Sequence, residues 1–232
     1  MAHVSEEELL ATRIRDMGEP LGLVYDSLTK ELTWLHVKWR LYRQLYAKSP
    51  ERIDLLKRTA GHFFGVLRSA LADDIAMHLA RLTDAAQSFG HDNLTVQRLP
   101  KLLPQEVKTD ADRLLDRIKT TCEPVRTWRN RRGAHTDLGI ALSIEADPLP
   151  PISRAQIETA LELLGAILNR LDTHYWKTAG TRYDAVVVAP PTDADSLVYY
   201  LMKGVRAEEH REQRLRDGKP LPEDLRPDEE IP

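Results

Sequence analysis

The chain has 232 residues, of which 42% are hydrophobic and 30% are charged. These values are typical of an ordinary globular protein, and the length suits one large domain with a small appendage. The net charge of −3 excludes a global attraction to nucleic acid, so any such binding must come from a local basic patch. A single cysteine excludes an intrachain disulfide framework, and no apolar run is long enough for a signal core or a membrane span. We therefore expect a cytoplasmic protein that does not contact a membrane.

Two helices are predicted at the N-terminus. Ser5 followed by glutamates is a helix start, and Gly18 ends that helix. A second helix is expected from about residue 20 to residue 47, because apolar side chains recur mostly three and four positions apart. Its aromatic side chains can stack on bases, but at this spacing they are more often core or dimer-interface residues. They are Trp34, Trp39, Tyr42 and Tyr46.

A third helix should begin at Pro50, with Ser49 as its cap, bend near Gly61 and reach about residue 87. Residues 88–93 are expected to form a loop, and the prolines of the following LPKLLP segment break the helical pattern again.

A fourth helix is predicted over about residues 109–132, and Pro124 should kink or restart it. After an irregular connector over residues 141–152, Ser153 and Gln156 form a capping box for a helix that reaches about Lys177. Two apolar segments, residues 138–142 and 182–191, can pair as short strands.

The C-terminal region is expected to hold one more helix, which starts after Asp193 or Asp195. The proline-rich, acidic tail that follows it should be extended or disordered. We predict an all-α fold, an antiparallel helical bundle with an extra C-terminal helix and a short irregular or β segment. The expected division is an N-terminal helix (1–18), a helical domain (19–180), an extension with a helix (181–217) and a flexible tail (218–232).

The segment WRNRRGAHTD, residues 128–137, crowds basic side chains around Gly133. On a helical wheel, Arg129 falls within an apolar stripe, whereas Arg131 points to the far side. An unpaired buried charge is very costly, so Arg129 must find an anion, a carboxylate or a partner subunit. The stripe also holds Cys122, which can be a nucleophile or, more often in such surroundings, a buried inert thiol.

Gly133 is suited to end the helix in a left-handed turn that brings the imidazole of His135 near Arg129. Together the two side chains suit phosphodiester chemistry, because guanidinium binds phosphate oxygens bidentately and imidazole moves protons near neutral pH. In the alternative interpretation, basic residues complement the dipole of a last helical turn, and Gly followed by His is an ordinary cap.

The segment RNRRGAH resembles the R-(N/D/H)-x4-H signature of HEPN-domain proteins, with matches at Arg129, Asn130 and His135. The aromatic residue before the signature, the small residue before the histidine and the LARLTD helix end over 79–84 resemble the AbiU2-like branch. The resemblance covers roughly residues 20 to 180.

This resemblance implies a helical bundle that pairs as a homodimer, with two motifs facing each other across a cleft. Many HEPN proteins are metal-independent endoribonucleases of phage defence or toxin–antitoxin systems, so it implies an RNA substrate, no cofactor and an antitoxin or regulatory protein as a partner. His135 would be the general base or acid, Arg129 the phosphate-binding residue and Asn130 a polar support, with Arg132 a further RNA-binding candidate. No tyrosine follows His135, so a nucleotidyltransferase antitoxin is a less expected regulator.

His78 lies within the apolar stripe of the third helix, flanked by Asp74 and Arg81. One interpretation is a buried hydrogen-bonded network that packs this helix on its neighbours. The other adds Asp74 or Arg81 to the cleft, where they orient its functional groups. Asp84 is expected to form a local salt bridge or a helix-end interaction.

Three functions therefore remain open. The chain can be a HEPN-type endoribonuclease, a non-catalytic HEPN-like module that binds RNA or protein, or an adaptor whose arginine pairs with a carboxylate across a dimer. The sequence has no HExxH or CxxC pattern for a metal and no glycine-rich phosphate loop.

Overall fold

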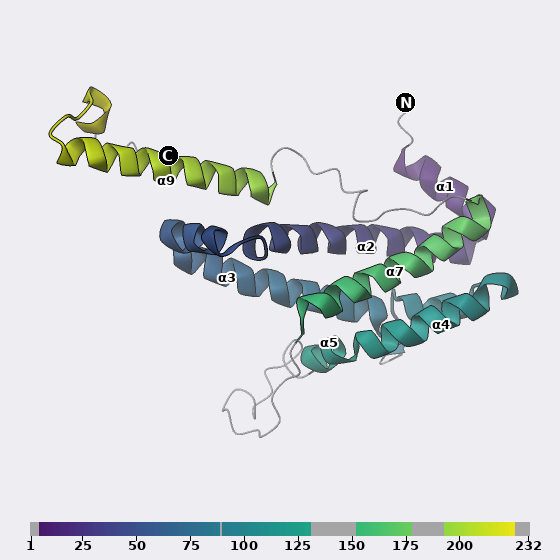
Figure 1. Cartoon of the computed structure of the whole chain (residues 1–232). Helices are drawn as coiled ribbons and strands as arrows, with labels where there is room; N and C mark the ends of the chain where they lie inside the picture. The colour runs from purple at the N-terminus through teal and green to yellow at the C-terminus, as the bar shows by residue number, and fades with distance from the viewer. Residues whose placement is uncertain (1–4, 89, 131–151, 178–192, 226–232) are drawn as a thin grey trace, which may run out of the picture. The chain divides into compact units, whose positions relative to one another are not determined.

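The structure is a computed structural model that describes residues 5–88, 90–130, 152–177 and 193–225. Helices dominate these residues, with one small β-hairpin (Figure 1). The α-helices are α1 (Glu6–Met17), α2 (Glu19–Tyr46), α3 (Pro50–Thr83), α4 (Gln105–Thr121), α5 (Glu123–Trp128), α7 (Arg154–Trp176) and α9 (Ala194–Arg216). The other elements are the strands β1 (Gln87–Ser88) and β2 (His91–Asp92) and the 3₁₀ helices η1 (Val96–Lys101) and η3 (Pro222–Leu225). The expected all-α fold class is confirmed.

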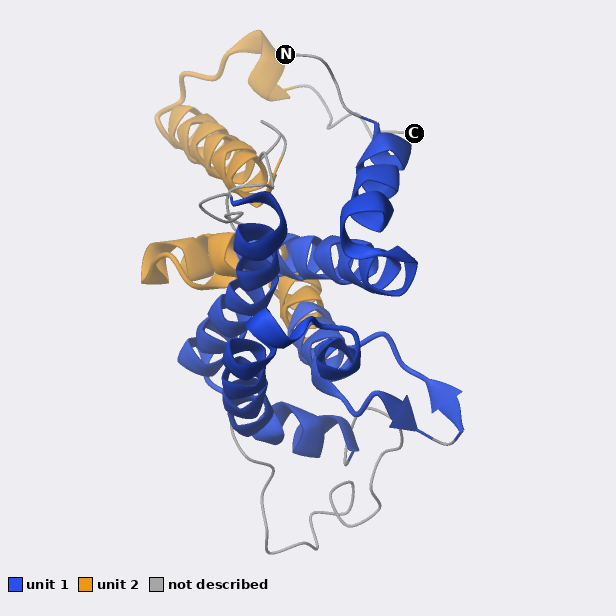
Figure 2. Cartoon of the chain, turned by 90° about the vertical axis from the view of Figure 1, so that its right-hand side faces the viewer, with its two compact units in different colours: residues 1–40, 70–188 blue, residues 41–69, 189–232 orange. Residues whose placement is uncertain are grey.

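The chain divides into two units, which Figure 2 shows in different colours. Unit 1 comprises residues 1–40 and 70–188, and unit 2 comprises residues 41–69 and 189–232. Because α2 and α3 are long, each contributes one part to each unit. The four domains expected from the sequence stay a prediction.

In unit 1, the first two helices begin and end as the sequence predicts. The Ser5 side chain accepts a hydrogen bond from the Glu8 backbone, the Glu8 side chain accepts one from the Ser5 backbone, and Gly18 ends α1 with a φ of 81°. Gly22 then lies directly against α1, because a Cβ at this position would sit 2.8 Å from the carbonyl group of Arg13 and the Cα of Ile14. Only glycine allows the two backbones to approach this closely.

The core of unit 1 is built from leucine-rich helix faces. The α2 stripe is buried at the spacing that the sequence shows, and α4 and α7 bury their own apolar faces. Asp110, early in α4, binds Arg170, late in α7, at 2.9 Å, so these two helices run antiparallel. In the same last turns of α7, Trp176 donates a hydrogen bond to Asp16 at 2.7 Å and the Tyr25 hydroxyl binds Asp172, which joins α7 to α1 and α2.

The aromatic residues of α2 divide into two kinds. Trp39 is buried, and Tyr42 and Tyr46 are half-buried, but Trp34 is 62% exposed. A core role is therefore wrong for Trp34, whose indole faces solvent, and base stacking and a dimer interface stay open for it.

Helix α3 confirms the predicted bend and corrects the predicted end. Its backbone leaves the helical region at Ala60 (φ −151°, ψ 61°), next to Gly61. It ends at Thr83 rather than near residue 87, because the Thr95 hydroxyl donates to the carbonyl oxygens of Leu82 and Asp84 at 2.9 and 2.7 Å.

The segment expected to be a loop after α3 is a β-hairpin. Gln87 pairs with Asp92 and Ser88 with His91 in antiparallel register (Figure 2). Gly90 makes the turn possible, since its φ of 80° lies in the region that favours glycine.

Helices α4 and α5 occupy the predicted fourth helix and are separate, as the proline suggests. Pro124 lies in the first turn of α5, and the break falls at Cys122, where α4 ends. Cys122 is fully buried, and burial raises the pKa of its thiol, which supports the inert interpretation. Helix α4 begins at Gln105, earlier than expected, because Pro104 is extended and directly precedes it.

Helix α7 follows the capping box of Ser153 and Gln156 and ends at Trp176, with Lys177 in the left-handed conformation. Both predictions for this helix are confirmed. The predicted connector and the two predicted strands lie largely or wholly outside the described residues.

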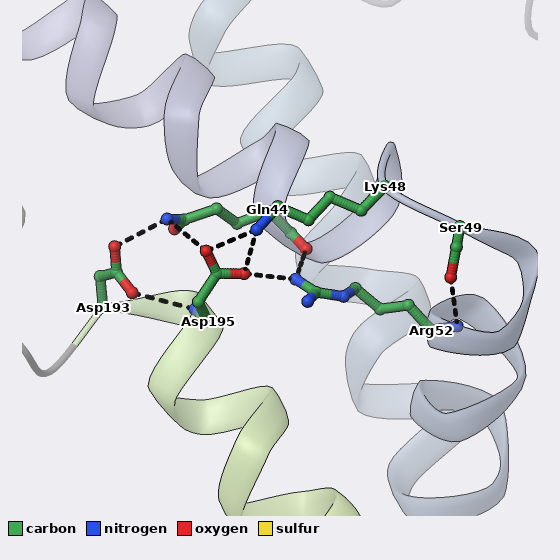
Figure 3. A network of polar contacts seen from close by, with 6 residues as sticks. All are labelled: Gln44, Lys48, Ser49, Arg52, Asp193 and Asp195. Carbon is green, nitrogen blue, oxygen red and sulfur yellow. Dashed lines mark hydrogen bonds and ion pairs between the residues drawn. The ribbon is translucent and has the colours of Figure 1, made fainter.

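In unit 2, an acidic network anchors the start of α9 (Figure 3). Asp193 caps the helix, and Asp195 accepts hydrogen bonds from Lys48 at 2.6 Å and Arg52 at 2.6 Å. Gln44 donates to Asp193 at 2.7 Å and to Asp195 at 3.1 Å. Although burial acts in the opposite direction, the hydrogen bonds from Lys48 and Arg52 keep the pKa of Asp195 below its ordinary value.

In the described part of the tail after α9, residues 222–225 form the 3₁₀ helix η3 rather than an extended or disordered segment, and residues 226–232 lie outside the described residues. Asp224 in η3 is buried and binds Arg214 of α9, and the Leu221 backbone donates to it at 2.8 Å. Arg214 and the Leu221 amide lower the pKa of Asp224 to about 2, so the carboxylate stays ionised in this contact. Sequence composition did not reveal this pairing of two charged side chains.

No helix in the described part of the chain is both long and apolar enough to cross a bilayer.

The close approach at Gly22 predicts a specific loss of stability. Gly22→Ala should lower the free energy of unfolding by about 1–3 kcal/mol, because the added methyl group must push α1 away from α2. Urea denaturation followed by far-UV circular dichroism measures this change. Gly65→Ala is the matched control, since a Cβ there meets nothing within 4 Å, and it should leave stability unchanged or raised. A Gly22→Ala variant as stable as the parent would contradict the packing described for α1 and α2.

Candidate functional site

The candidate site starts at Arg129, which directly follows α5. Its backbone remains helical (φ −59°, ψ −47°), and its guanidinium Nη1 forms an ion pair with Asp84, the residue after α3. The Arg129 side chain is 25% exposed and that of Asp84 is 19% exposed. Arg129 is therefore partly buried and paired with a carboxylate, as its place in the apolar stripe requires. Trp128 before it is half-buried.

Asn130 holds the other side of the same guanidinium. Its Oδ1 accepts hydrogen bonds from Arg129 Nε at 3.1 Å and Nη2 at 2.7 Å. All three nitrogens of Arg129 thus have a contact, which fixes the plane of the group. Because guanidinium carries five N–H donors, two of them remain available to a ligand.

Arg126 supports the same junction, one turn before Arg129. Its Nη1 donates to the carbonyl oxygen of Thr83 at 3.5 Å, and its Nη2 donates to Glu123 at 2.6 Å. Two arginines on one side of α5 therefore reach the C-terminal end of α3. Positive side chains are favourable there because they complement the dipole of the helix.

Burial lowers the pKa of Arg129 from its ordinary value. Arginine nevertheless stays protonated at any physiological pH, so the side chain remains a cation. The contacts with Asp84 and Asn130 fix the orientation of its guanidinium.

An open cleft lies beside this ion pair, with a volume of about 390 Å³. Asp84 lies in its wall, so the residue that holds Arg129 also faces the cleft. The lining residues come from α2, the end of α3 and the hairpin: Glu31, His78, Arg81, Leu82, Asp84, Asp92, Asn93 and Leu94.

His78 belongs to a polar network on the α2 side of the cleft. Lys38 lies 3.3 Å from His78 Nδ1 and 2.7 Å from Asp74, and His78 Nε2 lies 2.7 Å from Glu31. The predicted buried network between helices is therefore present. Burial and the nearby Lys38 lower the pKa of His78, against the effect of Glu31, so the imidazole is neutral near pH 7.

The structure separates the two residues that flank His78 in the sequence. Arg81 lines the cleft, whereas Asp74 pairs with Lys38 and does not line it. An orienting role in the cleft thus has geometric support for Arg81 alone.

His135, Arg132 and Gly133 lie outside the described residues. The structure therefore brings Arg129 together with Asn130 and Asp84, and the expected proximity of Arg129 and His135 remains a prediction.

Asp84 is the residue whose role the sequence did not reveal. It was expected to form a local salt bridge or a helix-end contact, but its partner is Arg129, far along the chain. Two features of the sequence indicated this pair separately: an acidic residue at the end of a helix, and an arginine in an apolar stripe that needs an anion. The pairing lies within one chain. A carboxylate reached across a dimer stays a prediction.

Among the described residues, no group of three or more His, Cys, Asp or Glu side chains could hold a metal ion.

Comparison with protein families identifies the chain. The family model described as AbiU2, a HEPN family, matches residues 19–188, which is more than half of the sequence. This chain belongs to the AbiU2 family of HEPN proteins. The match spans α2 to α7, and so includes Asp84, Arg129 and Asn130. Comparison with curated proteins and comparison with solved structures each gave no match.

The ion pair at this site predicts an energetic coupling between its two residues. In a double-mutant cycle of Asp84→Ala and Arg129→Ala, the coupling free energy should be about 1 kcal/mol, because both side chains are mostly shielded from water. Denaturant unfolding of the four proteins measures it. The exposed pair of Asp54 and Lys57, 3.9 Å apart, is the control and should show almost no coupling. Equal coupling in the two pairs would contradict the partly buried contact at Arg129.

Proposed function

We propose that this AbiU2-family protein is a metal-independent endoribonuclease of the abortive-infection or toxin type. The observation that carries the proposal is the guanidinium of Arg129, which Asp84 and Asn130 hold in one orientation beside an open cleft. A cation fixed before the substrate arrives stabilises developing negative charge without reorganisation.

In this proposal, Arg129 binds the scissile phosphate of RNA. The N–H groups that Asp84 and Asn130 leave available donate to two non-bridging phosphate oxygens, a geometry that guanidinium matches well. As the attacking oxygen approaches, negative charge builds on those oxygens, and the fixed cation offsets it. Asp84 and Asn130 position Arg129 and do not touch the reacting atoms.

His135 is proposed to transfer the protons. Its imidazole accepts the proton of the ribose 2′-hydroxyl while the O2′–P bond forms, and the P–O5′ bond then breaks. The proton that His135 has taken passes to the departing 5′-oxygen, which leaves as a hydroxyl group. The products are a 2′,3′-cyclic phosphate and a 5′-hydroxyl end, and the route uses no metal-activated water and no cofactor.

The proposal includes a homodimer, in which a second copy supplies a second motif across a shared cleft. A neighbouring antitoxin or regulatory protein would restrain such an enzyme. Arg132, close in sequence to the motif, would add to RNA binding.

One observation favours a second candidate function, a non-catalytic module that binds RNA or a protein. The carboxylate of Asp84 already neutralises Arg129. An arginine kept in this pair for stability alone would bind RNA weakly and would not assist cleavage.

Cleavage in the presence of EDTA tests the proposal. Single-stranded RNA should be cut by the parent protein to products with cyclic phosphate ends, and Arg129→Ala and His135→Ala should each slow cleavage about 100-fold or more. Product ends are identified by mass spectrometry, and folding is checked by circular dichroism. Arg117→Ala, which removes an exposed arginine of α4, is the matched control and should cleave normally.

Two results would decide against the enzyme. If neither substitution changes cleavage, the assigned residues are not the catalytic ones. If the parent protein binds RNA in a salt-sensitive manner but never cleaves it, the binding module is the better description.

A further inference from the structure

The cleft beside Asp84 carries hydrogen-bonding groups that Arg129 and His135 do not account for. Arg81 contributes a guanidinium, Asp84 and Asp92 contribute carboxylates, and Leu82 and Leu94 contribute apolar surface. All of these residues lie within unit 1. The cleft therefore offers a donor, several acceptors and an apolar wall to one small ligand.

Arg81 differs from the other arginines near the cleft. Arg98 binds Asp92, Arg126 binds Glu123 and Arg129 binds Asp84. The guanidinium of Arg81 is exposed and has no hydrogen-bond or ion-pair partner among the described residues. Its donors are thus available to a ligand in the cleft.

Two carboxylates of the cleft, Asp84 and Asp92, are each paired with an arginine. Arg98 and Gln87 lower the pKa of Asp92, and Arg129 pairs with Asp84. Ionised carboxylates repel phosphate and accept hydrogen bonds from N–H groups. The cleft therefore disfavours the RNA backbone and favours a part of RNA that carries N–H donors.

His78 also lines the cleft, and its side chain is 8% exposed. Its Nδ1 lies 3.3 Å from Lys38 and its Nε2 lies 2.7 Å from Glu31, so both ring nitrogens face polar side chains of α2. His78 therefore forms part of the cleft wall and is not one of the groups available to a ligand.

We propose that this cleft binds a guanine base of the RNA, next to the phosphate held by Arg129. This inference rests on the proposed ribonuclease function. Guanine alone among the four bases presents adjacent N1–H and N2–H donors, which match a carboxylate, together with O6, an acceptor that matches Arg81. The volume of about 390 Å³ suits one base, and Leu82 and Leu94 supply apolar surface against it.

The other bases fit this set of groups less well. Adenine and cytosine place an acceptor where the carboxylates are, and uracil offers a single donor between two acceptors. A lysine or arginine side chain from a protein partner would suit the carboxylates, but the unpaired Arg81 repels it. The cleft therefore determines sequence preference, whereas Arg129 binds every phosphate alike.

Cleavage-site mapping on a random single-stranded RNA pool tests the inference. The parent protein should cut mainly where guanine occupies one fixed position relative to the scissile phosphate. Arg81→Ala should reduce that guanine preference about tenfold or more while cleavage continues, since one bidentate base contact is lost. Arg117→Ala should keep the preference. Cleavage without any base preference would overturn this inference and leave the ribonuclease intact.

A binding measurement separates this inference from the ribonuclease proposal. In NMR titrations, guanosine monophosphate should shift the amide signals of Asn93 and Leu94 more than the adenosine, cytidine and uridine monophosphates do. Asp92→Asn should remove that difference; Asp84 is left unchanged because it holds Arg129. Selective guanosine binding by a protein that cleaves no RNA would support the cleft assignment and defeat the ribonuclease. Shifts produced by an arginine-rich peptide and not by guanosine monophosphate would assign the cleft to a protein partner.

Discussion

The ion pair between Arg129 and Asp84 is the contact on which the site depends. Arg129 lies in the apolar stripe that continues from α4 through α5, where an unpaired charge would be strongly destabilising. Asp84 supplies the opposite charge from the end of α3, and Arg126 reaches the neighbouring Thr83 carbonyl. The same contact joins two chain segments and holds a cation against Asp84, which lies in the wall of the cleft. In the proposed function, one pair of residues therefore serves both stability and catalysis.

In the proposed function, this arrangement separates two kinds of recognition within unit 1. Arg129 presents positive charge suited to phosphate, whereas the adjoining cleft presents carboxylates suited to N–H donors. The imidazole of His78 and the guanidinium of Arg81, which has no partner in the described part of the chain, lie on the cleft side. The sequence match shows membership in the AbiU2 family of HEPN proteins. A nucleotide that spans both regions would be oriented at its phosphate and at its base.

Sequence alone predicted the parts of the structure that depend on local chemistry. Ser5 and Ser153 cap their helices as their neighbouring residues require, Pro124 restarts a helix, and the wheel showed that Arg129 needs an anion. It did not identify Asp84 as that anion, because a long-range pair leaves no periodic pattern. The buried Asp224 was missed for the same reason, and the hairpin after α3 was missed because its strands have two residues each. The helical spacing of Trp34 predicted a buried side chain, but the side chain is exposed. Periodicity shows which face of a helix is apolar, but it does not show how far the buried part of that face extends around the helix.

The most direct measurement is the NMR signal of the Arg129 side-chain Nε–H, assigned by its absence in Arg129→Lys. A 2′-O-methylated single-stranded RNA binds but cannot be cleaved by 2′-hydroxyl attack, so it keeps the complex intact. The account predicts a sharp Arg129 signal in the free protein, because Asp84 and Asn130 hold the group, and a clear shift on addition of this RNA. An Arg129 signal that this RNA leaves unchanged, while other signals show that it binds, would contradict a role for Arg129 in phosphate binding.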